Sequence, residues 1–226
     1  MSVDSRHKSS AESYMKHIVK YMSEQSKNSI GTGDLSRLIG VTPGSATSML
    51  KKLAADGYLQ YRPHRGCTLT GKGRLFGIAM LRRHRLLETF LVKTLHYDPA
   101  EVHDEAERLE YAVSDTFLER VDAALGHPDR DPHGDEIPKK GQKSLTVTDM
   151  ALCTAPEFIM LTVSRVSGNS GRMQYLYDMG IMPGKEIALL HQNREAGTVQ
   201  IEVDERKITV GVAVLDDIHV YPPCSR

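Results

Sequence analysis

The stretch Thr42-Pro-Gly-Ser-Ala-Thr-Ser-Met-Leu-Lys-Lys52 decides the fold of the first third of the chain. Thr42 suits a helix N-cap, and Pro43 follows at the first helical position, where its missing N–H costs nothing. Ala46, Leu50 and Leu53 then repeat on one apolar face. The remaining faces carry small hydroxyl side chains and lysines: Ser45, Thr47, Ser48, Lys51 and Lys52.

The segments on either side of this stretch complete a known arrangement. An amphipathic pattern predicts a helix over residues 11–25, and a short helix over residues 35–39 with Asp34 as its N-cap. Two β-prone runs, residues 58–61 and 67–70, flank a basic tip that contains Arg65. Paired helices followed by a hairpin indicate a winged helix-turn-helix, whose second paired helix enters the major groove of DNA.

The residues expected to contact double-stranded DNA lie on this second helix and at the hairpin tip. They are Thr42, Pro43, Ser45, Thr47, Ser48, Lys51, Lys52 and Arg65. The alternative is a small helical domain that contacts another protein.

The net charge of zero hides an uneven distribution. Residues 1–72 hold 11 Lys and Arg against 5 Asp and Glu, whereas residues 73–141 hold 10 against 14. A basic head joined to an acidic middle is consistent with a DNA-facing domain next to a carboxylate-rich one.

The middle of the chain is predicted to be helical. Apolar residues recur over residues 72–95, and a second helix is predicted over residues 100–125. Both helices carry more apolar surface than a winged helix can cover. This excess favours a symmetric homodimer, which would bind a palindromic DNA site. The alternative is an ordinary core within one chain.

The last third is predicted to form a small β-barrel. Residues 126–141 are rich in Asp, Pro and Gly and indicate a linker. Short β-prone runs follow at residues 145–147, 158–163, 187–190, 199–203, 207–210 and 219–221, with one helix near residues 173–179. We therefore expect three domains, over residues 1–73, 74–141 and 142–226.

The acidic middle holds residues with metal-ligand spacing. His84 and Glu88 lie four residues apart, and His103, Glu107 and Glu110 lie at positions i, i+4 and i+7. Each set shares one helical face, and imidazoles with carboxylates suit first-row divalent ions. The alternative is solvated charge paired with nearby arginines: Arg82, Arg83, Arg85 and Arg108.

Several function classes are not supported by the sequence. No segment of the 226 residues approaches the roughly 20 apolar residues that span a bilayer, and the start does not read as a secretion signal. We therefore expect a cytoplasmic protein. No glycine-rich phosphate loop, nucleophile elbow or HExxH motif is present, so an enzyme is not expected.

The chain resembles the diphtheria-toxin-repressor and manganese-transport-regulator family of metal-dependent transcription factors. The resemblance spans nearly the whole chain and is most specific in Arg82-Arg-His-Arg-Leu-Leu-Glu88, Val102-His-Asp-Glu-Ala-Glu-Arg-Leu-Glu110 and Tyr177-Asp-Met-Gly-Ile-Met-Pro-Gly184. It implies a winged helix, a dimerisation domain and an SH3-like domain, in that order. It also implies that bound Mn²⁺ or Fe²⁺ ties the first helix to the dimerisation domain and favours operator binding.

The resemblance further assigns roles to single residues. His84, Glu88 and His103 match the ancillary metal site of the iron-responsive members, and Glu107 and Glu110 match two primary-site positions. Glu107 stands where manganese-type members have glutamate and iron-type members cysteine, which favours Mn²⁺ over Fe²⁺.

Three departures deplete the primary site: Tyr111, Ser13 and Lys16 replace family ligands, and a protonated lysine cannot ligate. In the terminal domain, Asn169 and Arg172 fall roughly where iron-type members offer Glu and Gln, so strong ligation is not expected from there. We therefore expect about one tight ion per subunit. Two hypotheses follow: a Mn²⁺- or Fe²⁺-dependent repressor of metal uptake, or a winged-helix regulator that has lost metal control and answers to a partner or another ligand.

Overall fold

The computed structural model describes residues 10–193 and 195–222 and divides into two compact units. The first comprises residues up to 90 together with 104–129 and 136–147, and the second comprises 91–103, 130–135 and 148 onward. The division passes through helices α5 (Gly71–Leu95) and α6 (Val102–Leu109), each of which is continuous. Among the described residues, no helix is both long and apolar enough to cross a membrane.

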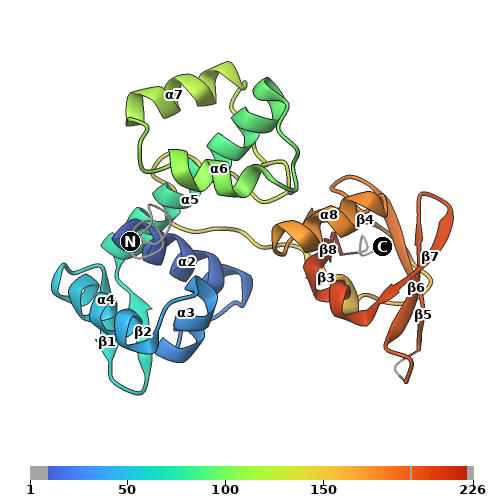
Figure 1. Cartoon of the computed structure of the whole chain (residues 1–226), viewed down its shortest axis with the longest axis horizontal. Coiled ribbons are helices and arrows are strands. Elements are labelled where there is room, and N and C mark those ends of the chain that lie inside the picture. The colour runs from blue at the N-terminus through green and yellow to red at the C-terminus, as the bar shows by residue number, and fades with distance from the viewer. Residues whose placement is uncertain (1–9, 194, 223–226) are drawn as a thin grey trace. The chain divides into compact units, whose positions relative to one another are not determined.

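The first unit begins with three helices and a hairpin (Figure 1): α2 (Ala11–Glu24), α3 (Thr32–Ile39), α4 (Pro43–Ala55), β1 (Leu59–Arg62) and β2 (Gly66–Leu69). These elements confirm the predicted winged helix-turn-helix order. Thr42 caps α4 as predicted, since its hydroxyl accepts from the Ser45 N–H at 3.2 Å. The N-cap prediction for α3 was wrong: Gly31 is the cap, and Asp34 lies in the first turn, paired with Arg37.

Apolar packing holds this group of elements together. The core contains Tyr14, Met15 and Ile18 of α2, which are at most 1% exposed, with Leu50 and Leu53 of α4. Helix α5 then packs closely on α2, because a Cβ at Gly77 would lie 2.3 Å from a Val19 methyl carbon. A larger residue at position 77 would therefore force the two helices apart.

The predicted helix over residues 100–125 is two helices, which corrects the sequence interpretation. Helix α6 ends at Leu109 and α7 spans Asp115–Ala124, with the Ser114 side chain capping α7. The Arg83 guanidinium donates to the carbonyls of Glu110 and Val113 at 3.2 and 2.6 Å. A side-chain cap and an arginine that satisfies the intervening carbonyls make the break stable.

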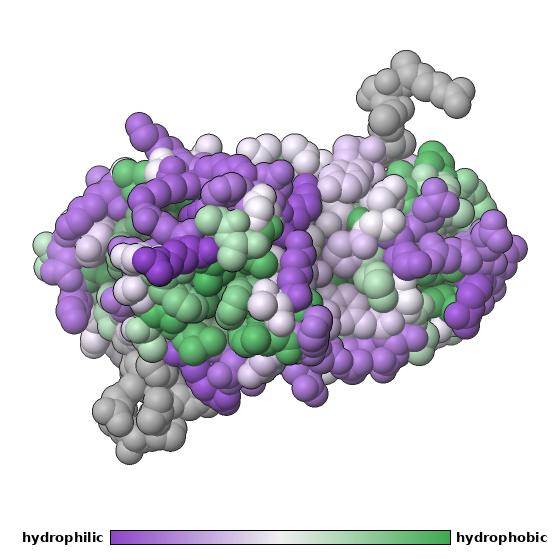
Figure 2. Space-filling view, turned by 90° about the horizontal axis from the view of Figure 1, so that it is seen from above, coloured by the Kyte–Doolittle hydropathy of each residue, from purple (hydrophilic) through white to green (hydrophobic). Residues whose placement is uncertain are grey.

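Apolar surface remains exposed on the helical side of this unit. Figure 2 looks onto the side where α6 and α7 lie in Figure 1, and apolar side chains gather there. Phe117 of α7 is 40% exposed and meets Phe90 edge-on, with ring centroids 6.3 Å apart. Exposed apolar side chains that gather in one patch are typical of a surface that another molecule covers.

The segment predicted as a linker is irregular in structure but partly buried. Ile137 is 1% exposed, and Asp131, His133 and Asp135 are each under 10% exposed. A Cβ at Gly134 would lie 2.1 Å from the Ser164 carbonyl oxygen, so this loop lies directly on β4 (Met160–Val166). Residues 130–135 are therefore a packed part of the second unit, whereas residues 126–129 and 136–141 belong to the first.

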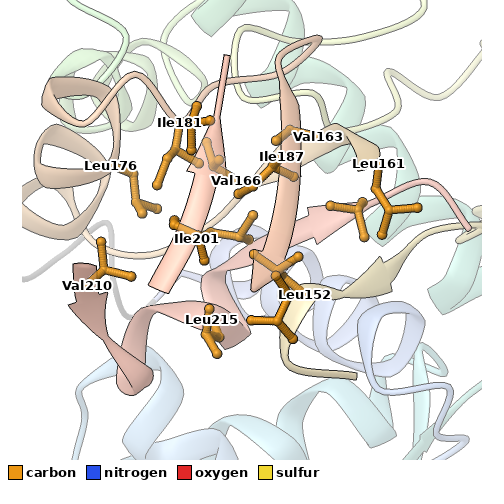
Figure 3. Close-up of a cluster of buried hydrophobic side chains, with 14 of the residues drawn as sticks. Leu152, Leu161, Val163, Val166, Leu176, Ile181, Ile187, Ile201, Val210 and Leu215 are labelled. Carbon is orange, nitrogen blue, oxygen red and sulfur yellow. The ribbon is translucent and has the colours of Figure 1, made fainter. Parts of the chain in front are cut away.

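The second unit is built on a six-stranded antiparallel sheet of order β3-β8-β4-β5-β6-β7. Its other elements are β3 (Met150–Ala151), β5 (Glu186–Asn193), β6 (Thr198–Val203), β7 (Arg206–Gly211), β8 (Ile218–Val220), helix α8 (Ser170–Asp178) and two 3-10 helices, Leu152–Thr154 and Val212–Asp217. Figure 3 shows its core, in which Leu152, Leu176, Ile187 and Ile201 are fully buried.

The strand predictions for this unit are mostly confirmed. The exception is residues 145–147, which form no strand. Leu145 instead packs beside Val19, Ile78 and Leu81 of the first unit. The apolar side chain that suggested a strand there packs against α2 and α5 instead.

Candidate metal centre and DNA-binding surface

Three of the predicted ligands converge on one place. Each of His84, Glu88 and His103 offers one ligand atom, and these atoms all lie within 4.8 Å of one another. His84 and Glu88 project from the same face of α5 and are 5% and 2% exposed, while His103 is exposed at the start of α6. Ligands about 2.1 Å from an octahedral ion stand about 3 to 4.2 Å apart, so small side-chain adjustments would fit this group around one.

The two ring nitrogens of His84 face different neighbours. Its Nε2 lies 3.0 Å from Glu88 Oε1, inside the group of possible ligands. Its Nδ1 lies 2.6 Å from Glu110 Oε2 and donates to that carboxylate. A carboxylate on the far nitrogen fixes the ring and leaves Nε2 available to a metal, which is the usual support of a histidine ligand.

Glu110, which the resemblance assigns to the primary metal site, lies on the other side of His84 from this group. It is 1% exposed and contacts the far side of His84, while the group of possible ligands does not include it or Glu107. Glu107 accepts a hydrogen bond from Lys16 Nζ at 3.2 Å. Of the five predicted ligands, the structure brings three together and places two beside a lysine.

Lys16 of α2 is the residue whose role the sequence interpretation missed. Its Nζ donates to Glu110 Oε1 and Oε2 at 2.8 and 3.0 Å and lies 3.4 Å from His84 Nδ1. The side chain is only 4% exposed, so the ammonium lies inside the unit. Its neighbours Met15, Ile18 and Val19 are buried on the same helix, and this apolar context was the signal that Lys16 also points inward.

The other two departures from the family pattern join the same network. The Tyr111 side chain hydrogen-bonds to Glu110, Ser10 and Ser13. Burial raises the pKa of the Tyr111 hydroxyl, and Glu110 raises it further, so the phenol stays protonated. Tyr111 thus joins Lys16 at the Glu110 carboxylate, and Ser13 is linked to that carboxylate through Tyr111.

Electrostatics support the same assignment of charges. Burial raises the pKa of Glu110, but hydrogen bonding and charge from His84, with smaller effects of Lys16, lower it to about 2. Burial lowers the pKa of His84, whereas the charge of Glu88 and the hydrogen bonds to Glu110 and Glu88 outweigh it and raise the value. Glu110 is therefore an anion at any working pH.

The arginines that could have neutralised these residues have other partners. Arg82 pairs with Asp122 at 2.7 Å, and Arg83 pairs with Asp115. Arg108 pairs with Glu105 at 3.0 Å, and Arg85 donates to the Glu136 carbonyl at 2.6 Å. Arg82, Arg83 and Arg108 therefore have acidic partners outside the group of possible ligands.

The predicted DNA contacts lie on an exposed surface of α4 and the hairpin. The exposed members of the set are Thr42, Pro43, Ser45, Ser48, Lys51, Lys52 and Arg65. Thr47 is half-buried, and its hydroxyl donates to the Pro43 carbonyl at 2.9 Å. Since the Thr42 and Ser45 hydroxyls lie 2.9 Å apart at the cap, Ser48 and the lysines are the side chains with the freest access to a groove.

Three family models match consecutive parts of the chain. Residues 8–67 match the N-terminal DNA-binding domain of iron-dependent repressors, residues 70–139 match their metal-binding and dimerisation domain, and residues 150–222 match the FeoA domain. Together they follow the order of elements found in the structure.

Relatives of known sequence and structure agree with these models. An HTH-type regulator of Methanocaldococcus jannaschii is 38% identical over 112 residues, which cover 50% of this chain and 89% of that protein. The HTH-type transcriptional regulator MntR of Bacillus subtilis is 32% identical over 136 residues, covering 60% and 91%. A manganese-dependent transcriptional repressor solved in complex with manganese is 36% identical, with a TM-score of 0.86, covering 94% of this chain and 100% of that one.

The helix-turn-helix with its exposed α4, the side chains converging from α5 and α6, and the terminal antiparallel sheet agree with what these comparisons find. The chain belongs to the iron-dependent repressor family of metal-dependent transcriptional regulators, in its form with a C-terminal FeoA domain.

Proposed function

We propose that this protein is a metal-dependent transcriptional repressor that binds a palindromic operator as a homodimer and controls metal-ion uptake. The observation that carries the proposal is the convergence of His84, Glu88 and His103 in a chain that also presents an exposed α4 and a basic hairpin. A protein that binds operator DNA acts in the cytoplasm, so we expect the protein there.

The metal of this proposal is Mn²⁺ in preference to Fe²⁺, held by His84, Glu88 and His103. These donors are two imidazoles and one carboxylate, without a thiolate, and such a set suits a hard or borderline first-row ion. Relatives named as manganese-dependent support the same choice. When bound, the ion supplies a divalent charge that joins α5 to α6.

The chain's own residues do the remaining work. The Glu110 carboxylate accepts a hydrogen bond from His84 Nδ1–H and so directs Nε2 toward Glu88. In the proposed complex with DNA, Ser45 and Ser48, with Thr47, face the groove, while Lys51, Lys52 and Arg65 reach phosphates, and Thr42 with Pro43 sets the start of the recognition helix. The apolar side of α7, with Phe117, is the proposed dimer surface.

The test is operator affinity with and without metal. A pool of random DNA duplexes is selected with Mn²⁺-loaded protein, and the affinity of the best duplex is then measured at fixed salt after chelation and after Mn²⁺ is restored. We expect binding at least about 10-fold tighter with Mn²⁺, the size of a typical allosteric coupling. Equal affinity in both states would favour the second hypothesis, a regulator without metal control, and failure to select any duplex would contradict DNA binding.

A further inference from the structure

A buried ammonium joins two helices that are far apart in sequence. Lys16 lies on α2, whereas its partners Glu107 and Glu110 lie on α6 and just after it. The side chains of Lys16 and Glu110 are 4% and 0% exposed. An ion pair this well shielded from water is screened little by salt, unlike a pair on the surface.

The carboxylates around Lys16 Nζ form a cation-binding site, which the ammonium occupies. Both oxygens of Glu110 lie within 3.0 Å and one oxygen of Glu107 lies at 3.2 Å, so two carboxylates face one ammonium. Two carboxylates that converge in a buried place would repel each other without a positive charge between them. The lysine supplies that charge through a covalent tether, and its presence does not depend on any ion in solution.

The same contacts leave little for a divalent ion. Glu110 already receives Lys16 on both oxygens, His84 Nδ1 on Oε2, and the Tyr111 side chain. A carboxylate offers about four lone-pair positions, and these contacts use them. A second ion would also sit beside the ammonium, and like charges at this range oppose binding strongly in a buried site.

We propose that the Lys16 ammonium is the permanent occupant of a cation site formed by Glu107 and Glu110, and that it fastens α2 to α6 in every metal state of the protein. A divalent ion does not fit this site, so metal acts only where His84 and Glu88 meet His103. The inference rests on the proposed function, because α2 shares a core with α3 and with the proposed recognition helix α4. Its tests use no DNA, so their failure is distinct from a failure to bind an operator.

The first test removes the charge and keeps the length of the side chain. Lys16→Met in the full chain, freed of metal, should lower the thermal unfolding midpoint by at least about 8 °C, because it leaves the Glu107 and Glu110 carboxylates without their cation. Lys20→Met is the matched control, since Lys20 lies one turn further on α2, is 40% exposed and lies 3.9 Å from Glu24. The control should shift the midpoint by no more than about 2 °C.

The variant should also bind more metal. With the tethered cation gone, the two carboxylates become available to Mn²⁺, and calorimetric titration should find two ions per subunit in Lys16→Met against one in the wild type. An unchanged midpoint together with an unchanged stoichiometry would overturn the proposal. Two ions in the wild type would overturn it as well.

A measurement on the unaltered protein covers the case in which Lys16→Met does not fold. Amide hydrogen exchange along α2 is compared between chelated and Mn²⁺-loaded wild-type protein. If Lys16 holds α2 in every metal state, protection of the α2 amides should differ by less than about 3-fold. Exchange more than 10-fold faster in the chelated protein would mean that metal fastens α2, which contradicts the proposal.

Discussion

Two neighbouring clusters of His and Glu side chains from α5 and the α6 region differ in the cation that they can hold. One gathers His84, Glu88 and His103, whose ligand atoms lie within 4.8 Å of one another. The other gathers Glu107 and Glu110 around the Lys16 ammonium. His84 belongs to both, since Nε2 faces the first and Nδ1 faces the second.

The difference teaches that carboxylates at family ligand positions do not by themselves make a metal site. The residue that α2 presents to them decides which cation they hold. A lysine places a single charge there permanently, whereas a site without its own cation can respond to the concentration of a metal in solution. On our proposal, the first cluster responds to metal in solution and the second does not.

The largest expected effect comes from removing the anion of the second cluster. Glu110→Gln should destabilise the metal-free protein by about 3 to 5 kcal/mol, because it leaves the Lys16 ammonium buried without its main counter-charge. Urea unfolding checks this value. Glu105→Gln, on α6 just before Glu110, is the control, since Glu105 is 33% exposed and pairs with Arg108 at the surface. It should change stability by less than about 1 kcal/mol. Equal effects of both substitutions would remove the distinction between the clusters.

The next effect belongs to the first cluster. His84→Ala should weaken Mn²⁺ binding at least about 100-fold, or about 2.7 kcal/mol, because one of three protein ligands is lost. Titration calorimetry on chelated protein measures it. His191→Ala, which alters an exposed histidine of β5, should leave the affinity unchanged. If His84→Ala keeps its affinity, the metal lies elsewhere.

Glu110→Gln should also change the affinity for Mn²⁺, by less than His84→Ala does. The carboxylate orients His84 without ligating the ion, so its loss should weaken Mn²⁺ binding by about 10- to 100-fold, less than the loss of His84 itself. The same calorimetric titration gives the ratio of the two losses. Losses of equal size would make Glu110 a ligand.

Another buried cation, Arg165 in the second unit, extends the comparison to pH. Arg165 is 5% exposed, lies 2.8 Å from Asp149 and 3.8 Å from Asp135, and donates to His219 Nδ1 at 3.1 Å. Burial lowers the pKa of His219, Arg165 lowers it further, and Asp149, Asp135 and Asp216 oppose the shift, so that the pKa falls to about 4.

The direction of the pH effect follows from that shift. The folded state keeps His219 neutral, while the unfolded state takes up a proton below pH about 6.5, so stability is lost as the pH falls from 6.5 to 4. The half-buried ring is partly screened, and we expect a loss of about 1 to 2 kcal/mol in that window. Hydrogen exchange of β4 and β8 amides measures it, and a His219→Asn variant with the same pH dependence would disprove the assignment.

The smallest expected effect lies at the hairpin tip. Arg65→Ala should weaken binding to all duplexes alike and reduce the slope of log affinity against log salt by about one, as for one lost phosphate contact. Exposed Arg65 should act through its charge alone, so Arg65→Lys should restore the slope. An unchanged slope in Arg65→Ala would remove this residue from the DNA surface.

The sequence predicted most helices and strands because their signals are local. Thr42 and Pro43 indicate the start of α4, and apolar periodicity indicates α2 and α5. The break between α6 and α7 was missed because the apolar pattern continues through it, and its stability depends on Arg83 from another helix.

The site was predictable in part for the same reason. His84 and Glu88 are one turn apart, so their common face follows from spacing, and His103 was linked to them through the family resemblance. Lys16 lies 94 positions before Glu110, and no local pattern connects them. A protonated lysine cannot be a ligand, so this much about Lys16 followed from the sequence. Its contact with Glu110 became visible only in the structure.

The most direct test of the central claim is anomalous diffraction at the manganese edge from crystals of the full chain grown with Mn²⁺. We predict one strong peak per subunit in the α5–α6 region, among His84, Glu88 and His103, with the Lys16 ammonium still between Glu107 and Glu110. A peak between Glu107 and Glu110, with Lys16 displaced, would contradict the account.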